Sequence, residues 1–174
     1  SSMALNLTFK RSKLAFNKAK ESFVNSPLII LLPNKSCFSL PKAIKQSYLQ
    51  PKIAHQRGYT AFGVEHAKDN DAPDLKEFWQ NGRTHTGEGN TPTYPANVWP
   101  EKDVPEFKPV IDGLFNQMES LSQDILSACS QYLGKPQDWL GGMSQEGNTI
   151  MRIIHYPPVG DHAPAGAVRS AAHE

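Results

Sequence analysis

The sequence predicts an α+β fold, in which a helical region is followed by a small number of strands. Apolar side chains recur at steps of three and four over residues 104–133, which is the period of an amphipathic helix. Residues 149–156 are rich in β-branched side chains, alternate in character and stop before two prolines, as a strand does. Residues 56–100 hold short aromatic runs separated by glycine and turn residues, which indicates loops and short strands.

The amino-terminal part differs in charge from the rest of the chain. Residues 1–52 contain nine of the 18 Lys and Arg residues and a single acid, Glu21, whereas residues 53–174 contain nine bases and 16 acids. Such a basic segment can bind nucleic acid or a membrane surface. It lacks the interleaved aromatic and basic pattern of an RNA-binding module, so we expect no nucleic-acid partner. The longest aliphatic run, residues 28–32, is too short to span a bilayer, so we expect no membrane partner.

The first elements after the basic segment are short. Residues 39–49 contain Ser39 and Pro41, followed by mixed apolar and basic residues, which predicts a short helix capped by Ser39. Residues 82–105 contain seven glycines and prolines. This composition predicts a long connection without a regular helix.

The long helix predicted over residues 104–133 ends at Gly134 and Pro136. Its polar and apolar faces are distinct, so we expect a scaffold element that packs on the core. Residues 140–148 follow as a turn and lead into the strand. Because side chains alternate along a strand, one face of the strand carries Ile150, Arg152, Ile154 and Tyr156, and the other carries Met151, Ile153 and His155.

The chain contains two cysteines, Cys37 and Cys129, which lie far apart in sequence. They have neither the spacing of a metal site nor that of a redox motif. Isolated cysteines of this kind are typical of a reducing compartment, so we expect a cytoplasmic location.

Five stretches together carry a resemblance to a known family. They are "GYTAFGVEHAKDNDAPDLKEFW", "NVWP", the long helix, "NTIMRIIHYPP" and "GAVRSAAHE", in this order. From about Phe38 to the end, they resemble the isopenicillin N synthase-like branch of the iron(II)/2-oxoglutarate-dependent oxygenases. The resemblance implies that the strands belong to a double-stranded β-helix, or jelly-roll, core.

The resemblance divides the chain into three parts. Residues 1–36 form a divergent basic amino-terminal segment, because they do not match the strands and helix with which relatives open. Residues 37–146 correspond to the amino-terminal oxygenase region with its long scaffold helix. Residues 147–174 correspond to the start of the double-stranded β-helix catalytic domain, so the expected core is incomplete and the chain is expected to be a truncated fragment.

A candidate metal ligand stands near the end of the chain. Non-haem oxygenases bind Fe(II) through two histidines and one carboxylate, and in this family the first histidine belongs to a His-x-Asp motif. The resemblance places His173 at that histidine and Glu174 at the intervening position. Because strand side chains alternate, Glu174 would face away from the metal. From spacing alone, His173 would be read as a solvent-exposed histidine.

The resemblance also implies roles for residues around the pocket. Tyr156 matches a tyrosine that helps to bind the 2-oxoglutarate carboxylate, although a tyrosine at a strand end is also commonly structural. Phe78 and Trp79 match a segment near the substrate pocket, although an aromatic pair in a strand ordinarily belongs to the core. Arg169 is a candidate for binding an anionic group of the substrate. Arg152 could bind an anion, but pairing with an acidic neighbour is favoured.

The resemblance implies an enzyme that oxidises a small organic substrate with O2 and releases succinate and CO2. Fe(II) is the expected cofactor and 2-oxoglutarate the expected co-substrate, and the fragment alone is expected to be inactive. Two other classes stay open. One is a non-catalytic binding or interaction remnant of the oxygenase scaffold, and the other is an isopenicillin N synthase-like oxidase that uses no 2-oxoglutarate.

Overall fold

A computed structural model describes residues 36–66, 72–83, 94–145, 147–160, 163 and 165–171. The chain divides into two compact units. Residues 106–147 lie in a helical unit, and a sheet unit combines residues 34–105 with residues 148–174. The divergent basic segment predicted for residues 1–36 lies outside the described residues, except for its last position.

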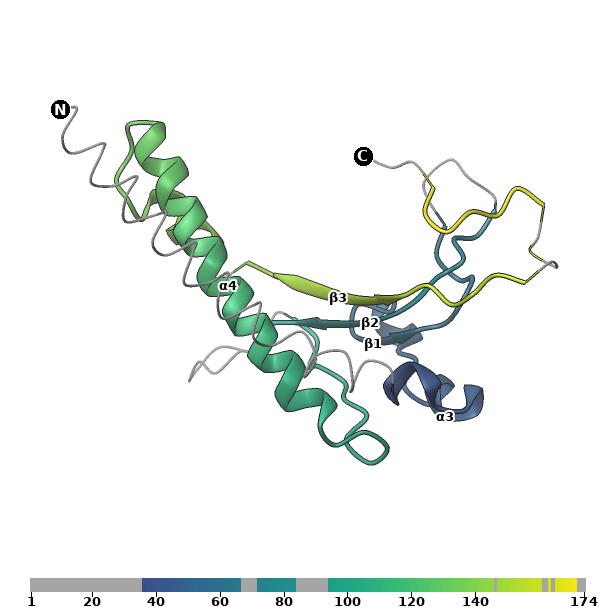
Figure 1. Ribbon diagram of the computed structural model, residues 1–174. Helices are drawn as coiled ribbons and strands as arrows, with labels where there is room; N and C mark the ends of the chain where they lie inside the picture. The colour runs from purple at the N-terminus through teal and green to yellow at the C-terminus, as the bar shows by residue number, and fades with distance from the viewer. Residues whose placement is uncertain are drawn as a thin grey trace. The chain divides into compact units, whose positions relative to one another are not determined.

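The helical unit contains α4, Phe107–Tyr132, and the shorter α5, Trp139–Ser144 (Figure 1). The helix predicted over residues 104–133 is therefore confirmed to within a turn at its start. Near that start its apolar side chains are buried, at Phe107, Ile111 and Phe115. Farther along, Met118 and Ile125 are 46% and 52% exposed. The prediction of a core-facing helix thus holds for its amino-terminal half.

The end of α4 is fixed by the glycine that the sequence indicated. Gly134 has φ +67°, a left-handed conformation that a side chain would disfavour. The amide of Gly134 donates to the carbonyl of Gln131 at 3.0 Å, and the amide of Lys135 donates to the carbonyl of Ser130 at 2.9 Å. These two bonds form a Schellman motif, which satisfies carbonyls that the helix itself leaves free.

The turn predicted over residues 140–148 is wrong in its first half, because residues up to Ser144 belong to α5. The two glycines of α5 disfavour a helix by themselves. Bonds from α4 offset this preference. The hydroxyl of Ser130 accepts a hydrogen bond from the backbone amide of Leu140 at 3.1 Å. The side-chain amide nitrogen (Nε2) of Gln123 donates to the hydroxyl of Ser144 at 2.9 Å.

The sheet unit is built on three antiparallel strands in the order β1-β2-β3 (Figure 1). β1 is Gly58–Thr60, β2 is Glu77–Gly82 and β3 is Ile150–His155. The strand predicted over residues 149–156 is confirmed as β3. β2 lies between the two other strands, and all six of its residues are buried.

Three short helical elements precede β1 in the described residues. α3, Lys42–Gln46, begins directly after Pro41, which takes the N-cap position and makes no side-chain cap hydrogen bond. The cap predicted at Ser39 is therefore wrong, since Ser39 lies in a separate helical turn at residues 36–39. Proline suits the first positions of a helix because its φ is already helical and its missing amide is not needed there. A 3₁₀ turn, Pro51–Ile53, follows.

The two faces of the sheet differ in burial. On one face, Trp79 lies between Tyr59 of β1 and Ile153 of β3 and is fully buried. On the other face, Ile150 and Ile154 are 38% and 43% exposed. Exposure alternates along β3, as predicted from the sequence. The core of the sheet unit therefore lies on the Trp79 side.

The segments around the sheet are mostly irregular. Residues 94–105, the described part of the connection predicted over 82–105, hold neither helix nor strand. After β3, the chain returns to pair through an isolated parallel bridge between Asp74 and Val168. Apart from this bridge, residues 165–171 hold neither helix nor strand.

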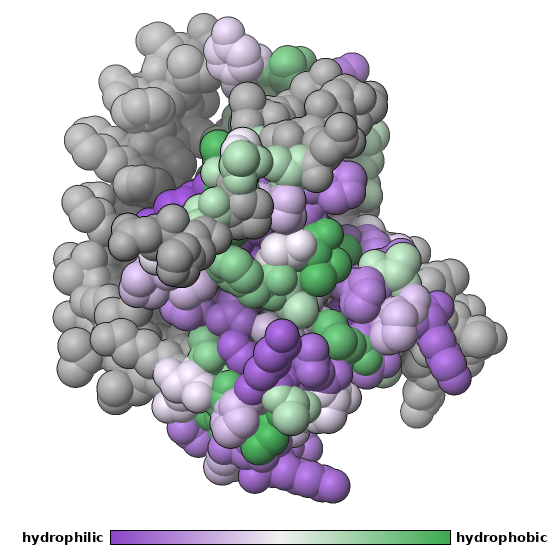
Figure 2. Space-filling model, turned by 90° about the vertical axis from the view of Figure 1, so that its right-hand side faces the viewer, coloured by the Kyte–Doolittle hydropathy of each residue, from purple (hydrophilic) through white to green (hydrophobic). Residues whose placement is uncertain are grey.

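Helices and an antiparallel sheet are both present, so the α+β class is confirmed. Figure 2 shows separate hydrophobic patches among hydrophilic ones on the face that it presents, not one continuous apolar surface. No helix in the described parts of the chain combines the length and the apolar character needed to cross a bilayer.

Candidate functional site

Four of the predicted site residues are described by the structure, and all four belong to the sheet unit. Phe78 and Trp79 are neighbours in β2, Tyr156 directly follows β3, and Arg169 lies in the segment that returns after β3. The structure brings Tyr156 and Arg169 together, as shown below. His173 lies outside the described residues.

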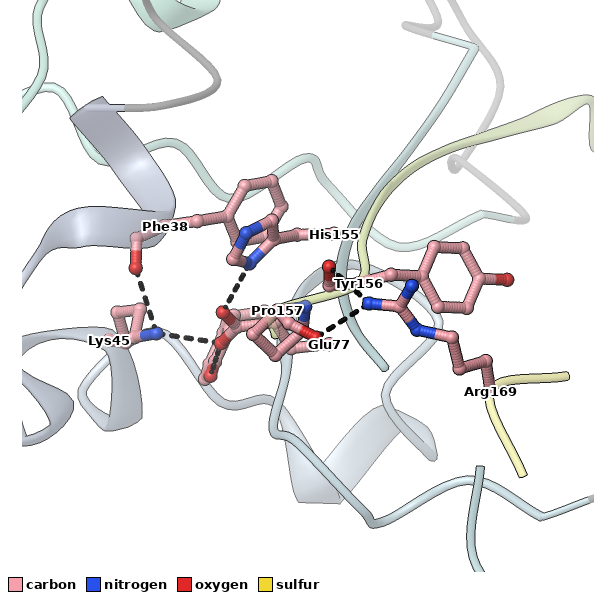
Figure 3. A network of polar contacts seen from close by, with 8 residues as sticks. Phe38, Lys45, Glu77, His155, Tyr156, Pro157 and Arg169 are labelled. Carbon is pink, nitrogen blue, oxygen red and sulfur yellow. Dashed lines mark hydrogen bonds and ion pairs between the residues drawn. The ribbon is translucent and has the colours of Figure 1, made fainter. Parts of the chain in front are cut away.

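Tyr156 and Arg169 meet at the carboxyl end of β3 (Figure 3). The Nη2 of Arg169 donates to the backbone carbonyls of Tyr156 and Pro157 at 3.1 and 2.7 Å. The guanidinium also lies over the Tyr156 ring, 5.8 Å from its centroid, a cation–π arrangement. The Tyr156 side chain keeps its hydroxyl without a hydrogen-bond partner among the described residues and is 37% exposed. Both side chains can therefore contact a ligand.

A cavity of about 510 Å³ lies beside Arg169. It is an open depression, and apolar residues line it beside Arg169: Leu75, Pro158, Val159, Ala163, Ala167 and Val168. Its volume falls in the range of small-molecule sites. One cation beside apolar walls suits a small organic molecule with an anionic group.

The two aromatic candidates of β2 are core residues. Trp79 is fully buried, and its indole nitrogen donates to the carbonyl of Val98 at 2.9 Å. Phe78 is 3% exposed, and the Arg152 guanidinium covers its ring at 4.8 Å. Both side chains are therefore buried core residues, which agrees with the alternative that an aromatic pair in a strand belongs to the core.

Arg152 pairs with neighbours in the sheet unit, as the sequence favoured. Its Nη1 lies 2.9 Å from Oε1 of Glu65, and its Nε donates to Oε1 of Gln80 at 2.7 Å. Glu65 in turn lies 2.8 Å from the Lys76 ammonium. Arg152 is therefore part of a charged network along the exposed face of the sheet.

A buried carboxylate at the start of β2 was not foreseen from the sequence. Glu77 Oε2 accepts from Lys45 at 2.7 Å and from the Tyr59 hydroxyl, and its Oε1 lies 2.8 Å from Nδ1 of His155. Figure 3 shows this cluster, with the Phe38 ring stacked on His155 at a centroid distance of 5.0 Å. The partners lie 32, 18 and 78 residues from Glu77, so no local pattern could reveal them.

The charge state of Glu77 follows from these contacts. Burial would raise the pKa of Glu77, but the hydrogen bonds from Lys45, Tyr59 and His155 more than offset burial, and the net pKa is lowered from 4.5. The carboxylate is therefore ionised at neutral pH. Through this one carboxylate, β2 is hydrogen-bonded to side chains from α3, β1 and β3.

A second cluster was also missed, and it holds the segment that follows the cavity. Oδ1 of Asp74 accepts the amide of Ala171 at 3.0 Å, and the amide of Leu75 donates to the carbonyl of Val168 at 2.8 Å. Oδ2 of Asp74 lies 2.8 Å from the Lys76 ammonium. Burial alone would lower the pKa of Lys76, but the bonds to Asp74 and Glu65 raise it. The charges in "DLKE" were the available signal for this cluster.

A metal site cannot be assembled from the described residues alone. No group of three or more His, Cys, Asp or Glu side chains in this part of the chain could hold a metal ion. The family's ligand set is two imidazoles and a carboxylate. His173, the candidate for one imidazole, lies outside the residues that the structure describes.

Comparisons with known proteins give one consistent family. A family model described as the amino-terminal region of non-haem dioxygenases in morphine synthesis matches residues 31–102. A proline hydroxylase of Petromyces alliaceus is 26% identical over 171 residues, covering 93% of this chain and 52% of the relative. A 2-oxoglutarate-Fe(II) type oxidoreductase of Metarhizium rileyi is 30% identical over 143 residues, covering 75% and 39%.

Solved structures agree with the sequence matches. A 2OG-Fe(II) oxygenase family protein from Caulobacter crescentus is 35% identical with a TM-score of 0.67, covering 78% of this chain and 44% of that protein. A full-length Neurospora crassa protein solved in complex with alpha-KG is 26% identical with a TM-score of 0.64, covering 83% and 46%. The chain spans about half the length of these relatives. From these matches, the chain belongs to the iron(II)/2-oxoglutarate-dependent oxygenases.

Proposed function

We propose that the protein is a non-haem Fe(II)/2-oxoglutarate-dependent dioxygenase that oxidises a small organic substrate. One oxygen atom of O2 enters the substrate and the other enters succinate, while 2-oxoglutarate loses CO2. The observation that carries the proposal is the likeness to the Caulobacter crescentus oxygenase, at 35% identity and a TM-score of 0.67. A relative solved with alpha-KG supports the co-substrate.

We assign His173 as a ligand of the iron and residues 147–174 as the first part of the double-stranded β-helix. When bound, Fe(II) supplies the redox chemistry that activates O2. The type of side chain supports the assignment, because imidazole suits Fe(II). The free thiols Cys37 and Cys129 support a reducing location such as the cytoplasm.

We assign Tyr156 to the carboxylate of 2-oxoglutarate and Arg169 to an anionic group of the substrate. Two features support the assignment of Tyr156. Its hydroxyl has no hydrogen-bond partner among the described residues, and the Arg169 guanidinium lies over its ring. Arg169 uses Nη2 for the carbonyls at the end of β3. Its other nitrogens can donate to a molecule in the cavity of about 510 Å³.

The decisive experiment measures succinate formed by a full-length form of the enzyme that contains these residues. Wild type with Fe(II), 2-oxoglutarate and O2 should form succinate, and His173→Ala should abolish it together with tight Fe(II) binding. His66→Ala, at an exposed histidine, is the matched control and should keep both. Equal succinate formation by His173→Ala would refute the ligand assignment.

The same assay separates the alternative functions. Substrate oxidation without succinate would identify an oxidase that uses no 2-oxoglutarate. A folded protein that neither binds Fe(II) nor consumes 2-oxoglutarate would identify a non-catalytic member of the family. Either result would overturn the proposed activity.

Tyr156→Phe tests the second assignment in the same protein. Loss of one hydrogen bond to a charged acceptor removes about 1.5–3 kcal/mol, or roughly a tenfold or larger loss of 2-oxoglutarate affinity. Fe(II) affinity should not change, since the ring is retained. If neither affinity changes, Tyr156 is a structural residue. If both fall together, the substitution has disturbed the fold.

A further inference from the structure

We propose that His155 is a positioning residue for Tyr156. Its hydrogen bond to Glu77 anchors the end of β3 and so determines where the Tyr156 hydroxyl can meet 2-oxoglutarate. This inference rests on the proposed function, since it takes Tyr156 as a residue that binds the co-substrate. His155 acts through its neighbour, because the two side chains point away from each other at the end of β3 (Figure 3), as adjacent side chains of a strand do.

A closed set of contacts holds the imidazole of His155. Its Nδ1 lies 2.8 Å from Oε1 of Glu77, and the Phe38 ring stacks on it with 21° between the two planes. Oε2 of Glu77 accepts from the Lys45 ammonium at 2.7 Å, and the same ammonium donates to the Phe38 carbonyl at 3.0 Å. The imidazole is therefore fixed both by a hydrogen bond and by a stacked ring (Figure 3).

The charge of Glu77 fixes the direction of its bond with His155. An ionised carboxylate can only accept, so Nδ1 of His155 carries the proton and donates it. A hydrogen bond to a charged acceptor is stronger than one between neutral groups. Glu77 and His155 are also Cα partners in the register of β2 and β3. The side-chain bond thus reinforces the pairing of these strands at its last position.

Tyr156 is the first residue beyond this anchor. The paired part of β3 ends at His155. The next two residues are Pro157 and Pro158, which have no amide hydrogen with which to continue the ladder. On the other side, Arg169 donates to the carbonyls of Tyr156 and Pro157. Tyr156 is therefore placed between two attachments, one made by His155 and the other by Arg169.

A merely structural role for His155 predicts a different result. Its side chain is 40% exposed, and without it Glu77 keeps its bonds to Lys45 and to the Tyr59 hydroxyl. We therefore expect the fold to survive substitution of His155. If His155 only added stability, its loss and the loss of the Tyr156 hydroxyl would weaken 2-oxoglutarate binding independently. If His155 acts through Tyr156, its loss has no further effect once that hydroxyl is gone.

The variants separate the donor from the ring. His155→Phe keeps a ring that can stack on Phe38 and removes the donor, whereas His155→Asn keeps an N–H donor at the position of Nδ1. His155→Leu removes both and is the second loss variant. Tyr48→Phe is the matched control, because it removes another side-chain hydrogen bond of the sheet unit, the one to Asp103.

Two measurements are made on the full-length enzyme. The affinity for 2-oxoglutarate is measured by isothermal titration calorimetry with Mn(II) in place of Fe(II), so that no turnover occurs. The placement of the Tyr156 ring is measured without metal or co-substrate, from the fluorine NMR signal of protein labelled with 3-fluorotyrosine. Tyr156→Phe identifies this signal by removing it.

His155→Phe and His155→Leu should weaken 2-oxoglutarate binding roughly three- to tenfold, and by no more than Tyr156→Phe does. Both should shift or split the Tyr156 fluorine signal. The double variant of His155→Phe and Tyr156→Phe should bind within about twofold of Tyr156→Phe alone. His155→Asn and Tyr48→Phe should stay within about twofold of wild type and leave the signal near its wild-type position.

The inference is overturned if folded His155→Phe and His155→Leu both bind 2-oxoglutarate as wild type does, or if His155→Asn or Tyr48→Phe loses as much affinity as they do. It is also overturned if the losses of His155→Phe and Tyr156→Phe multiply in the double variant. Wild type that binds no 2-oxoglutarate would overturn the proposed function itself. The fluorine signal would then still decide whether His155 places Tyr156: a changed signal in the loss variants supports that role, and an unchanged one overturns it.

Discussion

Replacing Glu77 by leucine would leave the Lys45 ammonium in the sheet unit without its charge partner. Leucine has a similar size and no acceptor, so Glu77→Leu removes the bonds to Lys45, Tyr59 and His155 at once. The side chains of Lys45 and Glu77 are only 12% and 5% exposed. Water therefore cannot replace the lost carboxylate without a change in the surrounding structure.

The expected effect is large for a single substitution. Breaking a buried ion pair by removing one partner lowers the free energy of unfolding by about 3–5 kcal/mol. Glu77→Gln keeps an acceptor oxygen and should lower it less. Adding Lys45→Met to Glu77→Leu should recover part of the loss, because the uncompensated charge is then removed.

The free energy of unfolding can be measured by urea denaturation followed by tryptophan fluorescence. Glu65→Leu is the matched control, since Glu65 also pairs with two cations but its side chain is 30% exposed. It should lower the free energy by no more than about 1 kcal/mol. Equal losses for Glu77→Leu and Glu65→Leu, or no recovery in the double variant, would refute the reasoning.

Three further predictions concern the same unit and the helix end. Because the pKa of Glu77 is lowered from 4.5 in the folded state, the carboxylate of the unfolded chain is protonated first as the pH falls. The free energy of unfolding of wild type should therefore decrease below pH 4.5, and urea titrations across that range should show a smaller decrease for Glu77→Leu. Gly58→Ala combines φ +79° with a backbone oxygen 2.6 Å from the new Cβ, and it should lower the free energy of unfolding by about 2–5 kcal/mol. At Gly134 the new Cβ would meet no atom within 4 Å, so Gly134→Ala should lower the free energy of unfolding by only about 1–2 kcal/mol. Equal losses for the two variants would contradict the steric argument. Burial raises the pKa of the Cys37 thiol to about 12, although the nearby Lys45 charge acts to lower it. Iodoacetamide on the native protein should therefore label the exposed Cys129 and spare Cys37, as peptide mass spectrometry would show, and comparable labelling of both would contradict this prediction.

The sequence determined the elements whose information is local. Apolar side chains at steps of three and four residues predicted α4, and Gly134 predicted where the helix ends. Alternation gave β3 and the two faces of that strand. The ordered stretches from "GYTAFG" to "GAVRSAAHE" also indicated the oxygenase family, which the comparisons confirm. The signals for α4 and β3 each lie within one continuous segment of chain, where spacing carries the pattern, whereas the family signal is the ordered set of separate stretches.

The tertiary structure decided which distant residues meet. Glu77 gathers partners from three other elements, and Asp74 reaches Ala171 across 97 residues. α5 formed despite its two glycines because α4 supplies hydrogen bonds to it. Trp79 became a core residue because the rings of Tyr48 and Tyr59 pack against it and the carbonyl of Val98 accepts its indole N–H. Such contacts depend on how strands pair and where loops return, and the spacing of residues along one chain does not specify either.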